Sequence, residues 1–219
     1  MKKILTIIAL AICSMTMMAQ ELHVGDLYYD IIPIEGGYAA EIVYHRSYKR
    51  LDSIAIPEYI TYQGLELPII IANWAFSGCK KLAGVYIPNT VIRIGHSAFY
   101  GTVLYNDPAN WENGALCIDG CLIEASAYIP EIYTINDGVR LIADYAFEGC
   151  RSSLKHITIP ASVKSIGEGI LRMSKSATIV FNGTMEQWQA IDKVSSSSSS
   201  SGLATYVHCT DGQVLIICN

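Results

Sequence analysis

One nine-residue pattern occurs three times in the chain, and this recurrence limits the possible folds more than any other feature of the sequence. Its copies begin at Ile71, Ile94 and Ile142, so the second interval is about twice as long as the first. A second pattern runs from Leu82 to Val91 and returns, three steps on, from Leu154 to Val163. A repeat of this length with apolar residues at fixed places indicates one coil of a solenoid, which must stack on neighbouring coils to bury its apolar face.

Each repeat contains a short strand followed by a return segment. Val85-Tyr86-Ile87 and Ile157-Thr158-Ile159 alternate with period two, which predicts strands whose first and third residues point into the core. A proline follows each strand and ends it, because proline cannot donate a ladder hydrogen bond. In the return segment, Ile-Gly-x-x-Ala-Phe-x-Gly, we expect the phenylalanine to fill the coil and the glycine to permit a tight bend.

At these residues the chain closely resembles the BspA-like (Treponema-type) leucine-rich repeat surface proteins, whose consensus includes Val-x-Ile-Pro-x-Ser-Val-x-x-Ile-Gly-x-x-Ala-Phe-x-Gly-Cys. Residues 82–101 match it well, residues 142–167 match with one inserted residue, and residues 51–79 match with an insertion near Gln63. Residues 110–114 and 181–188 are similar to segments of exported Bacteroidetes members. The chain departs from the pattern at Gly169-Ile170-Leu171 and across residues 102–131.

Repeat pattern and resemblance together predict an α/β, strand-rich fold: a leucine-rich-repeat solenoid of 23 to 24 residue coils with β caps at both ends. The expected organisation is a signal peptide at 1–19, an N-terminal β cap at 20–50 and the solenoid at 51–181. The solenoid carries an irregular hairpin insert at 102–131. Residues 182–219 should form a C-terminal cap with a short helix, a Ser-rich loop and a terminal hairpin.

Turn and capping signals define the irregular parts. Asp119-Gly120 lies between two apolar runs and predicts a two-residue hairpin turn, with Cys117 facing Leu122. Thr184 and Gln187 form a capping box that should start a short helix before Trp188. Asp211-Gly212 predicts a second hairpin, in which Cys209 would face Val214 and Cys218 would face Thr205.

The N-terminus has the form of a secretory signal. Lys2 and Lys3 precede an apolar run from Ile4 to Cys13, and a small-residue exit ends at Ala19, where cleavage would leave Gln20 first. Ile12 stands where a lipoprotein signal prefers a small residue, so lipid attachment at Cys13 is the lesser alternative. No later run has the roughly 18 apolar residues of a membrane span. We therefore expect export, to the cell surface, the periplasm or the medium.

Charge excludes nucleic acid as a partner. The chain is 51% hydrophobic and 16% charged, which is typical of a folded protein, and its formal net charge is −5. Removal of Lys2 and Lys3 leaves 13 basic against 20 acidic residues, and the sequence has no basic stripe. Anionic membrane surfaces are equally poor partners for such a chain.

Six cysteines remain after the predicted cleavage, and we expect all of them to be free. Cys79 and Cys150 occupy the same place in coils that we expect to be three rungs apart, about 14 Å, whereas bridged Cα atoms lie within about 7 Å. Across the Asp119-Gly120 turn, Cys117 and Cys121 should fall on opposite faces. Buried cysteine then acts as a small hydrophobic residue.

No sequence motif indicates catalysis, a metal centre or a cofactor. Nucleophile-elbow, zinc-protease, phosphate-loop and Cys-x-x-Cys patterns do not occur, and the five histidines are scattered. We therefore expect no catalytic residues, no metal site, no cofactor and no enzymatic activity.

Binding is the remaining function, and the outward strand residues are the candidates. They should form two columns across the concave face, one with Ala55, Tyr86, Thr134 and Thr158 and the other with Ser53, Gly84, Ile132 and His156. Tyr86 and His156 are the large, partly polar members, so they are the predicted ligand-binding residues, although another face could equally serve.

The resemblance implies a non-catalytic recognition protein, namely a cell-surface adhesin or a protein-binding module with an extracellular or surface protein as partner. The alternative is a glycan-binding or structural envelope protein, which a cluster of aromatic residues on one face would favour. An enzyme would instead require a cleft with perturbed ionisable groups.

Overall fold

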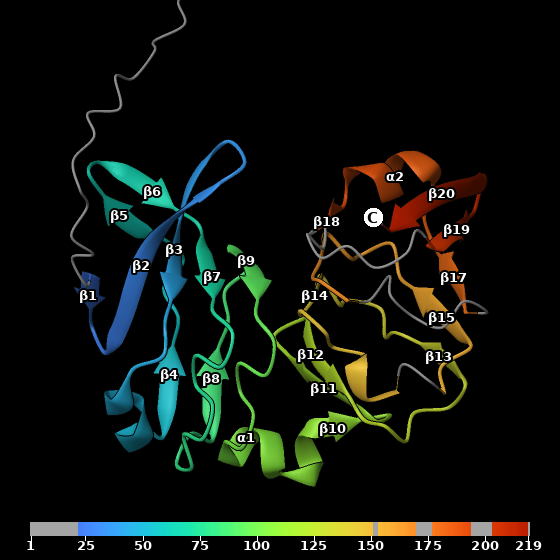
Figure 1. Cartoon of the computed structure of the whole chain (residues 1–219). Coiled ribbons are helices and arrows are strands. Elements are labelled where there is room, and N and C mark those ends of the chain that lie inside the picture. Colours follow the sequence, from blue (N-terminus) through green and yellow to red (C-terminus); the bar gives the residue numbers. More distant parts are fainter. Residues whose placement is uncertain (1–21, 151–152, 170–176, 194–202, 219) are drawn as a thin grey trace, which may run out of the picture.

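A computed structural model describes residues 22–150, 153–169, 177–193 and 203–218. The predicted signal peptide at 1–19 and the Ser-rich loop at 195–201 lie outside the described residues, as do two of the three residues at the Gly169 departure. Within the described part, strands predominate and the α-helices are short (Figure 1). The predicted strand-rich class is therefore confirmed.

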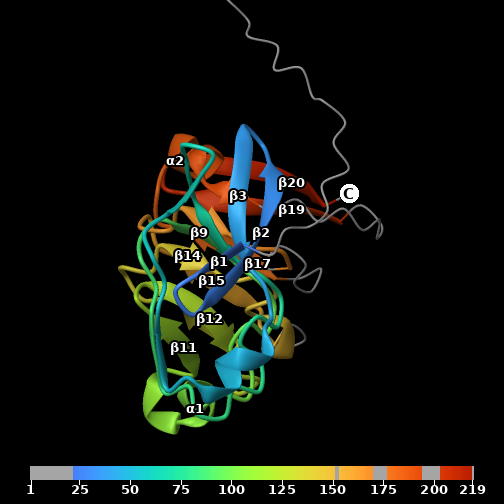
Figure 2. The same ribbon diagram turned by 90° about the vertical axis from the view of Figure 1, so that its left-hand side faces the viewer.

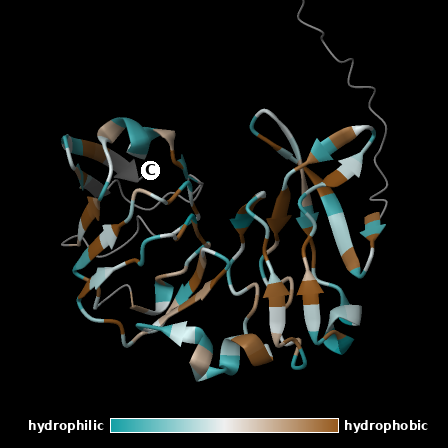
Figure 3. Ribbon diagram, turned by 180° about the vertical axis from the view of Figure 1, so that it is seen from behind, coloured by the Kyte–Doolittle hydropathy of each residue, from teal (hydrophilic) through white to brown (hydrophobic). Residues whose placement is uncertain are grey.

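The strands form two stacks that lie side by side, which we call the N-terminal half (residues 22–107) and the C-terminal half (residues 108–218). Figure 1 shows them at left and right, and in Figure 2 the N-terminal half faces the viewer. Hydrophobic segments lie along the strands of both halves (Figure 3). Buried residues from both halves form one hydrophobic cluster.

The main sheet of the N-terminal half begins as an antiparallel meander and continues as a parallel stack. Its order is β1-β2-β3-β7-β9. Ile42, Ile71 and Ile94 stand in register on β3, β7 and β9, and all three are buried, so each successive coil places isoleucine on isoleucine. The strands are β1 (Leu22–Val24), β2 (Leu27–Ile34), β3 (Gly37–Ile42), β7 (Ile69–Ile71) and β9 (Val91–Ile94).

Two smaller sheets, a 3-10 helix and a short α-helix complete this half. The parallel pair β4–β8 carries the outward residues of the predicted concave face, and β5–β6 is a hairpin at the insertion near Gln63. The elements are η1 (Arg46–Arg50), β4 (Ser53–Ala55), β5 (Ile60–Tyr62), β6 (Leu65–Leu67), β8 (Gly84–Tyr86) and α1 (Val103–Asn106).

The described residues of the C-terminal half form a six-stranded sheet, with the order β10-β11-β12-β14-β16-β18, and a five-stranded sheet, with the order β13-β15-β17-β19-β20. Parallel pairing carries the repeat through both. The elements are η2 (Pro108–Asn110), β10 (Trp111–Glu112), β11 (Ala115–Ile118), β12 (Cys121–Ala125), β13 (Ile132–Thr134), β14 (Leu141–Ile142), η3 (Glu148–Cys150), β15 (His156–Ile159), β16 (Ser165–Ile166), β17 (Thr178–Phe181), α2 (Met185–Ala190), β18 (Asp192–Lys193), β19 (Leu203–Cys209) and β20 (Gly212–Cys218).

Contacts between coils keep the period of the sequence repeat. The Asn73 side-chain oxygen accepts from the His96 N–H at 2.7 Å, 23 residues away, and Asp144 Oδ1 accepts from the Glu168 N–H at 2.9 Å, 24 residues away. Inside the coils Phe76 stacks on Phe99 with centroids 5.4 Å apart. The predicted core role of the repeat phenylalanines is confirmed.

The hairpin at Asp119-Gly120 is confirmed. Both residues have positive φ, and Cys117 pairs with Leu122 as predicted. Cys117 is exposed while Cys121 is buried, which places them on opposite faces. The structure gives Cys79, Cys150 and Cys209 as free cysteines too.

The C-terminal helix and hairpin form as predicted, but the strand register of the hairpin differs from the prediction. The capping box of Thr184 and Gln187 is present and starts α2. The terminal hairpin forms, but Cys209 pairs with Gly212, and Val207 rather than Cys209 faces Val214; Cys218 faces Leu203 rather than Thr205.

The predicted single ladder across the concave face is wrong. β4–β8 and β13-β15-β17-β19-β20 are separate sheets, so the outward residues form two sets of columns rather than one. Within each sheet the predicted columns hold, because Ala55 pairs with Tyr86 and Ile132 pairs with His156. The cause is the segment between the sheets, where η2 and the β10–β11–β12 strands replace the coil that would join them.

Side chains join the two halves where the ladder is interrupted. The Arg140 guanidinium donates to four backbone carbonyls, those of Ile87, Pro88, Asn89 and Val91, at 2.8–3.5 Å. The Asp119 carboxylate accepts from the Ile87 N–H at 2.8 Å. These contacts satisfy backbone groups that a neighbouring strand would otherwise bind.

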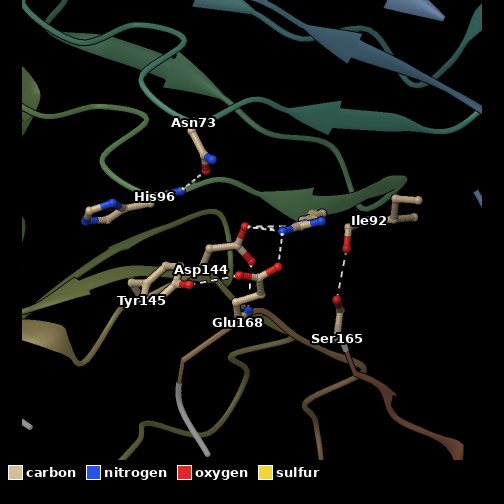
Figure 4. A network of polar contacts seen from close by, with 8 residues as sticks. Asn73, Ile92, His96, Asp144, Tyr145, Ser165 and Glu168 are labelled. Carbon is tan, nitrogen blue, oxygen red and sulfur yellow. Dashed lines mark hydrogen bonds and ion pairs between the residues drawn. The ribbon is translucent and has the colours of Figure 1, made fainter. Parts of the chain in front are cut away.

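An ion-pair cluster lies beside this junction (Figure 4). Arg93 on β9 lies 2.7 Å from Oδ2 of the buried Asp144 and 3.3 Å from Oε1 of Glu168. Burial works to lower the pKa of Arg93, but the hydrogen bond and charge of Asp144, with Glu168 and Glu41, outweigh it and raise that pKa. The Ser165 hydroxyl donates to the Ile92 carbonyl at 2.9 Å. The cluster therefore fixes β9 against the coils of the C-terminal half.

Candidate functional site

Tyr86 and His156, the predicted ligand-binding pair, are not brought together in one ladder. Tyr86 ends β8 with 53% of its surface exposed. His156 begins β15, is half-buried, and has its Nε2 atom 3.5 Å from the Thr158 hydroxyl. The two residues stand in different sheets, so the expected spacing of three rungs does not apply.

A different set of side chains forms a continuous surface. Six aromatic rings follow one another, each within 5.2 to 6.3 Å of the next between centroids. We call this set the aromatic row; in spatial order it is Trp111, Tyr105, Tyr100, Trp74, His96 and Tyr145.

The row crosses the junction between the two halves. His96 belongs to the N-terminal half and Tyr145 to the C-terminal half, with ring centroids 5.3 Å apart. At the other end, Trp111 meets Tyr105 edge-on, and its indole N–H donates to the Tyr105 carbonyl at 2.8 Å. The complete surface therefore exists only when the halves are docked.

Exposure is greatest at the centre of the row. Trp74 is 47% exposed and Tyr100 is 52% exposed, while the other members are half-buried. The neighbouring rings restrict their rotamers, since Trp74 meets both His96 and Tyr100 edge-on. Rigid aromatic rings can bind a ligand at a low cost in side-chain entropy.

The repeat itself directs two members of the row outward. Trp74 and Tyr145 occupy the same repeat position, and both have a positive φ, 61° and 56°. Such φ values are unfavourable for bulky residues. Backbone hydrogen bonds to the next coil support them, from the Trp74 N–H to the His96 carbonyl and from the Tyr145 N–H to the Glu168 carbonyl.

Carboxylates line the row. Glu124 accepts from the Tyr105 hydroxyl at 2.8 Å, Glu168 accepts from the Tyr145 hydroxyl at 2.9 Å, and a Glu148 oxygen lies 3.3 Å from His96 Nε2. Burial raises the pKa of Glu124, and Glu148 adds to this, while the Tyr105 hydrogen bond and His96 oppose it. Burial and Glu124 also raise the pKa of Tyr105. The row thus combines apolar rings with hydrogen-bond acceptors.

Sequence reasoning missed this surface because it considered only outward strand residues. The row lies on return segments, on α1 and at the start of β10. The recurrence of an aromatic residue at Trp74 and Tyr145 was the available signal, but Tyr105 and Trp111 lie in the irregular region and carry no repeat register.

In the described ranges, no group of three or more His, Cys, Asp or Glu side chains could hold a metal ion. Among those residues, no helix is both long and apolar enough to cross a membrane.

The stacked strands, the buried repeat phenylalanines and the contacts between residues 23 or 24 positions apart define a strand-rich protein built from sequence repeats. A family model for the BspA type leucine rich repeat region matches residues 44–107 and 125–198, in six copies. The chain therefore belongs to the BspA-type leucine-rich repeat family, as its resemblance implied.

Two solved structures are similar to it. One is a leucine-rich repeat protein from Bacteroides ovatus, with 16% identity and a TM-score of 0.28, covering 74% of this chain and 55% of that one. The other is a leucine rich cell surface protein from Faecalibacterium prausnitzii, with 13% identity and a TM-score of 0.20, covering 83% of this chain and 98% of that one. The chain thus spans about half the length of the Bacteroides protein. No curated protein matches the sequence.

Proposed function

We propose that this chain is an exported, non-catalytic recognition protein of adhesin type, which binds a protein partner at the bacterial surface through the aromatic row. The observation that carries the proposal is the row of contacting aromatic rings that crosses both halves, with Trp74 and Tyr100 exposed at its centre. Tryptophan and tyrosine are enriched among the residues that dominate protein interfaces. Family membership supports a recognition role, and the Faecalibacterium protein is described as a cell surface protein.

The proposed architecture behind this function is a solenoid of 23 to 24 residue coils in two segments. Hydrogen bonds between residues 23 or 24 positions apart support this coil length. In the proposal, residues 20–50 and 182–219 cap the two ends and residues 1–19 direct export. The cell surface, the periplasm and the medium stay open as destinations.

The test is a binding screen of the purified chain against extracellular-matrix proteins and a glycan array. Trp74→Ala and Tyr100→Ala should each cost about 2 kcal/mol of affinity for the protein ligand that the screen identifies, as anchor residues do. Tyr59→Ala is the matched control, because Tyr59 is also 47% exposed and lies outside the row. Equal affinity of all three variants and the wild type would remove the row as the binding site.

The pair Tyr86 and His156 stays a second proposed surface. Because Tyr86 is exposed and His156 half-buried, alanine at both should change stability by no more than roughly 0.5 to 1 kcal/mol. Lower affinity in the Tyr86→Ala, His156→Ala variant, with full affinity in Trp74→Ala, would move the binding site from the row to the strand faces.

A glycan partner is the second candidate function. The gathering of aromatic rings with flanking carboxylates favours it over a purely structural envelope role, because rings can stack on sugars and carboxylates accept from hydroxyl groups. A glycan-array signal that Trp74→Ala abolishes, without any protein ligand in the matrix screen, would select this candidate.

A further inference from the structure

One rung of the strand ladder is missing between β8 and β13. Gly84 begins β8 and Ile132 begins β13, two steps of the repeat further on, so a regular repeat would place a strand midway. At that point of the sequence the chain forms η2, Pro108–Asn110, instead of a strand, and the Asp107 carboxylate caps it by accepting from the Ala109 N–H at 2.9 Å. Proline at the first position lacks the N–H that a ladder requires. Both β8 and β13 therefore have one edge without a neighbouring strand.

At the β8 border, side chains bind the backbone next to the strand, at Ile87. Gly84 and Tyr86 use their backbone groups towards β4, as shown by the bonds from the Gly84 N–H to the Asp52 carbonyl and from the Ile56 N–H to the Tyr86 carbonyl. On the other edge, Asp119 binds the Ile87 N–H and Arg140 binds the Ile87 carbonyl. Side chains of this chain therefore cover part of this edge.

The β13 border is open. β13 pairs with β15 through the His156 N–H to the Glu131 carbonyl and the Ile135 N–H to the Thr158 carbonyl. In a parallel pair, alternate residues bond to one neighbour, so the N–H and C=O groups of Ile132 and Thr134 point to the other edge. Within the described ranges, no residue binds them.

Apolar surface surrounds this open edge. Ile132 is 69% exposed and Tyr128 is 95% exposed. A pocket of about 440 Å³ lies next to them, and the β10–β11 turn at Asn113 and Gly114 forms part of its wall. An unpaired edge beside exposed apolar side chains is the arrangement that favours pairing with another strand.

We propose that the open edge of β13 binds an extended segment of a partner protein, which adds to the sheet as a parallel strand in the place of the missing rung. The partner's backbone bonds Ile132 and Thr134, and one of its apolar side chains enters the pocket beside Tyr128, as in other strand-addition complexes. This site is separate from the aromatic row and does not depend on it.

The ladder geometry favours a partner segment over a second copy of this chain. The repeat strands β13, β15, β17 and β19 all run parallel, and the antiparallel strand β20 belongs to the terminal hairpin, so a strand in the place of the missing repeat runs parallel. Two β13 edges related by a two-fold axis would pair antiparallel instead.

The test uses a synthetic peptide of residues 154–160, Leu-Lys-His-Ile-Thr-Ile-Pro, which contains β15, the strand type that β13 already pairs with. Thr134→Pro removes an edge N–H that β15 does not use, and Thr134→Val keeps that N–H. We expect the labelled peptide to bind the wild type and Thr134→Val equally, and Thr134→Pro about tenfold more weakly, since backbone bonds to the strand are lost.

Two N-methylated peptides sharpen the result. Methylation of every second amide in one frame should abolish binding, and methylation in the other frame should not, because a strand offers alternate amides to one neighbour. Tyr128→Ala, at an exposed position, should also weaken binding and serves if Thr134→Pro fails to fold. No binding to the wild type, equal binding to all variants, or a wild-type dimer that Thr134→Pro dissociates would each overturn the proposal.

Discussion

Glycines at one repeat position permit the close approach of successive coils. A Cβ atom on Gly95 would lie 2.4 Å from the Asn73 nitrogen, and one on Gly167 would lie 2.5 Å from the Asp144 nitrogen. Both contacts involve backbone atoms of the preceding coil. These cannot move without disturbing the hydrogen bonds that the Asn73 and Asp144 side chains accept from the His96 and Glu168 N–H groups. The repeat therefore requires glycine here for space.

Alanine at either glycine should destabilise the fold. We expect Gly95→Ala and Gly167→Ala each to lower the free energy of unfolding by about 1–3 kcal/mol, the usual cost of overpacking. Gly84→Ala is the control, because its Cβ would meet only the Ser53 Cβ at an ordinary 3.8 Å. Urea unfolding measures all three, and equal stability of Gly95→Ala and Gly84→Ala would contradict the close-approach argument.

At the scale of elements, the sequence predicted correctly the features that depend only on adjacent residues. The Asp119-Gly120 turn and the Thr184 capping box depend on adjacent residues, and both are present. The terminal hairpin register depends on tertiary contacts: Asp211 accepts from the Met185 N–H, and a Cβ on Gly212 would lie 2.8 Å from the Met185 sulfur. Gly212 therefore serves packing against α2 rather than the turn, which the sequence alone could not reveal.

The missing rung and the aromatic row also involve contacts between residues far apart in the sequence. Repeat spacing predicted the pairing within β4–β8 and β13–β15, and the break between them lies in the predicted irregular region; the contacts of Asp119 and Arg140 across it, 32 and 53 residues from Ile87, have no sequence signal. Trp74 and Tyr145 meet through His96 only because the junction docks the two halves. No periodicity encodes such a contact.

The β2–β3 hairpin contains a pair of acidic residues that predicts a pH effect. Glu41 faces Asp30 across the strands. Burial raises the pKa of Glu41, and Asp30 raises it further, while Arg93 opposes the change. Because the folded-state pKa lies above the unfolded value, the folded chain binds more protons between the two, and stability falls as the pH rises through that window.

Replacement of Glu41 by glutamine should remove this penalty. We expect Glu41→Gln to stabilise the fold at pH 7 by about 0.2–1 kcal/mol, as expected for a like-charge cross-strand pair, and to lose this advantage as the pH falls below the ordinary glutamate pKa. Thermal melting across pH 4–7 measures the difference. Glu66→Gln is the control, since Glu66 faces Thr61; a stabilisation of Glu41→Gln that does not vary with pH would contradict the assignment.

At the scale of the whole molecule, the junction decides whether the two halves behave as one. In proteins built from repeats, each repeat contacts mainly its neighbours, so cooperative unfolding depends on each interface being strong. Here the interface is carried by the Arg93 cluster, by the Ile94 carbonyl that accepts from the Asp144 N–H, and by Arg140 on four carbonyls. The aromatic row and its proposed binding function depend on the same docking.

Loss of the Arg140 side chain should uncouple the halves. Arg140→Ala leaves four carbonyls without their donor, and we expect it to cost about 2 kcal/mol or more, since bonds to a charged group contribute about 1.5–3 kcal/mol. Arg140→Lys should restore little, because an ammonium cannot reproduce the planar guanidinium geometry.

In the wild type, native-state hydrogen exchange should show core amides of both halves opening at one free energy. In Arg140→Ala the two halves should open at different free energies. Lys155→Ala is the control, because Lys155 pairs only with the exposed Glu131 within the C-terminal half. A common opening free energy in Arg140→Ala would show that apolar packing of β9 against β14 and β16 holds the halves together without the guanidinium.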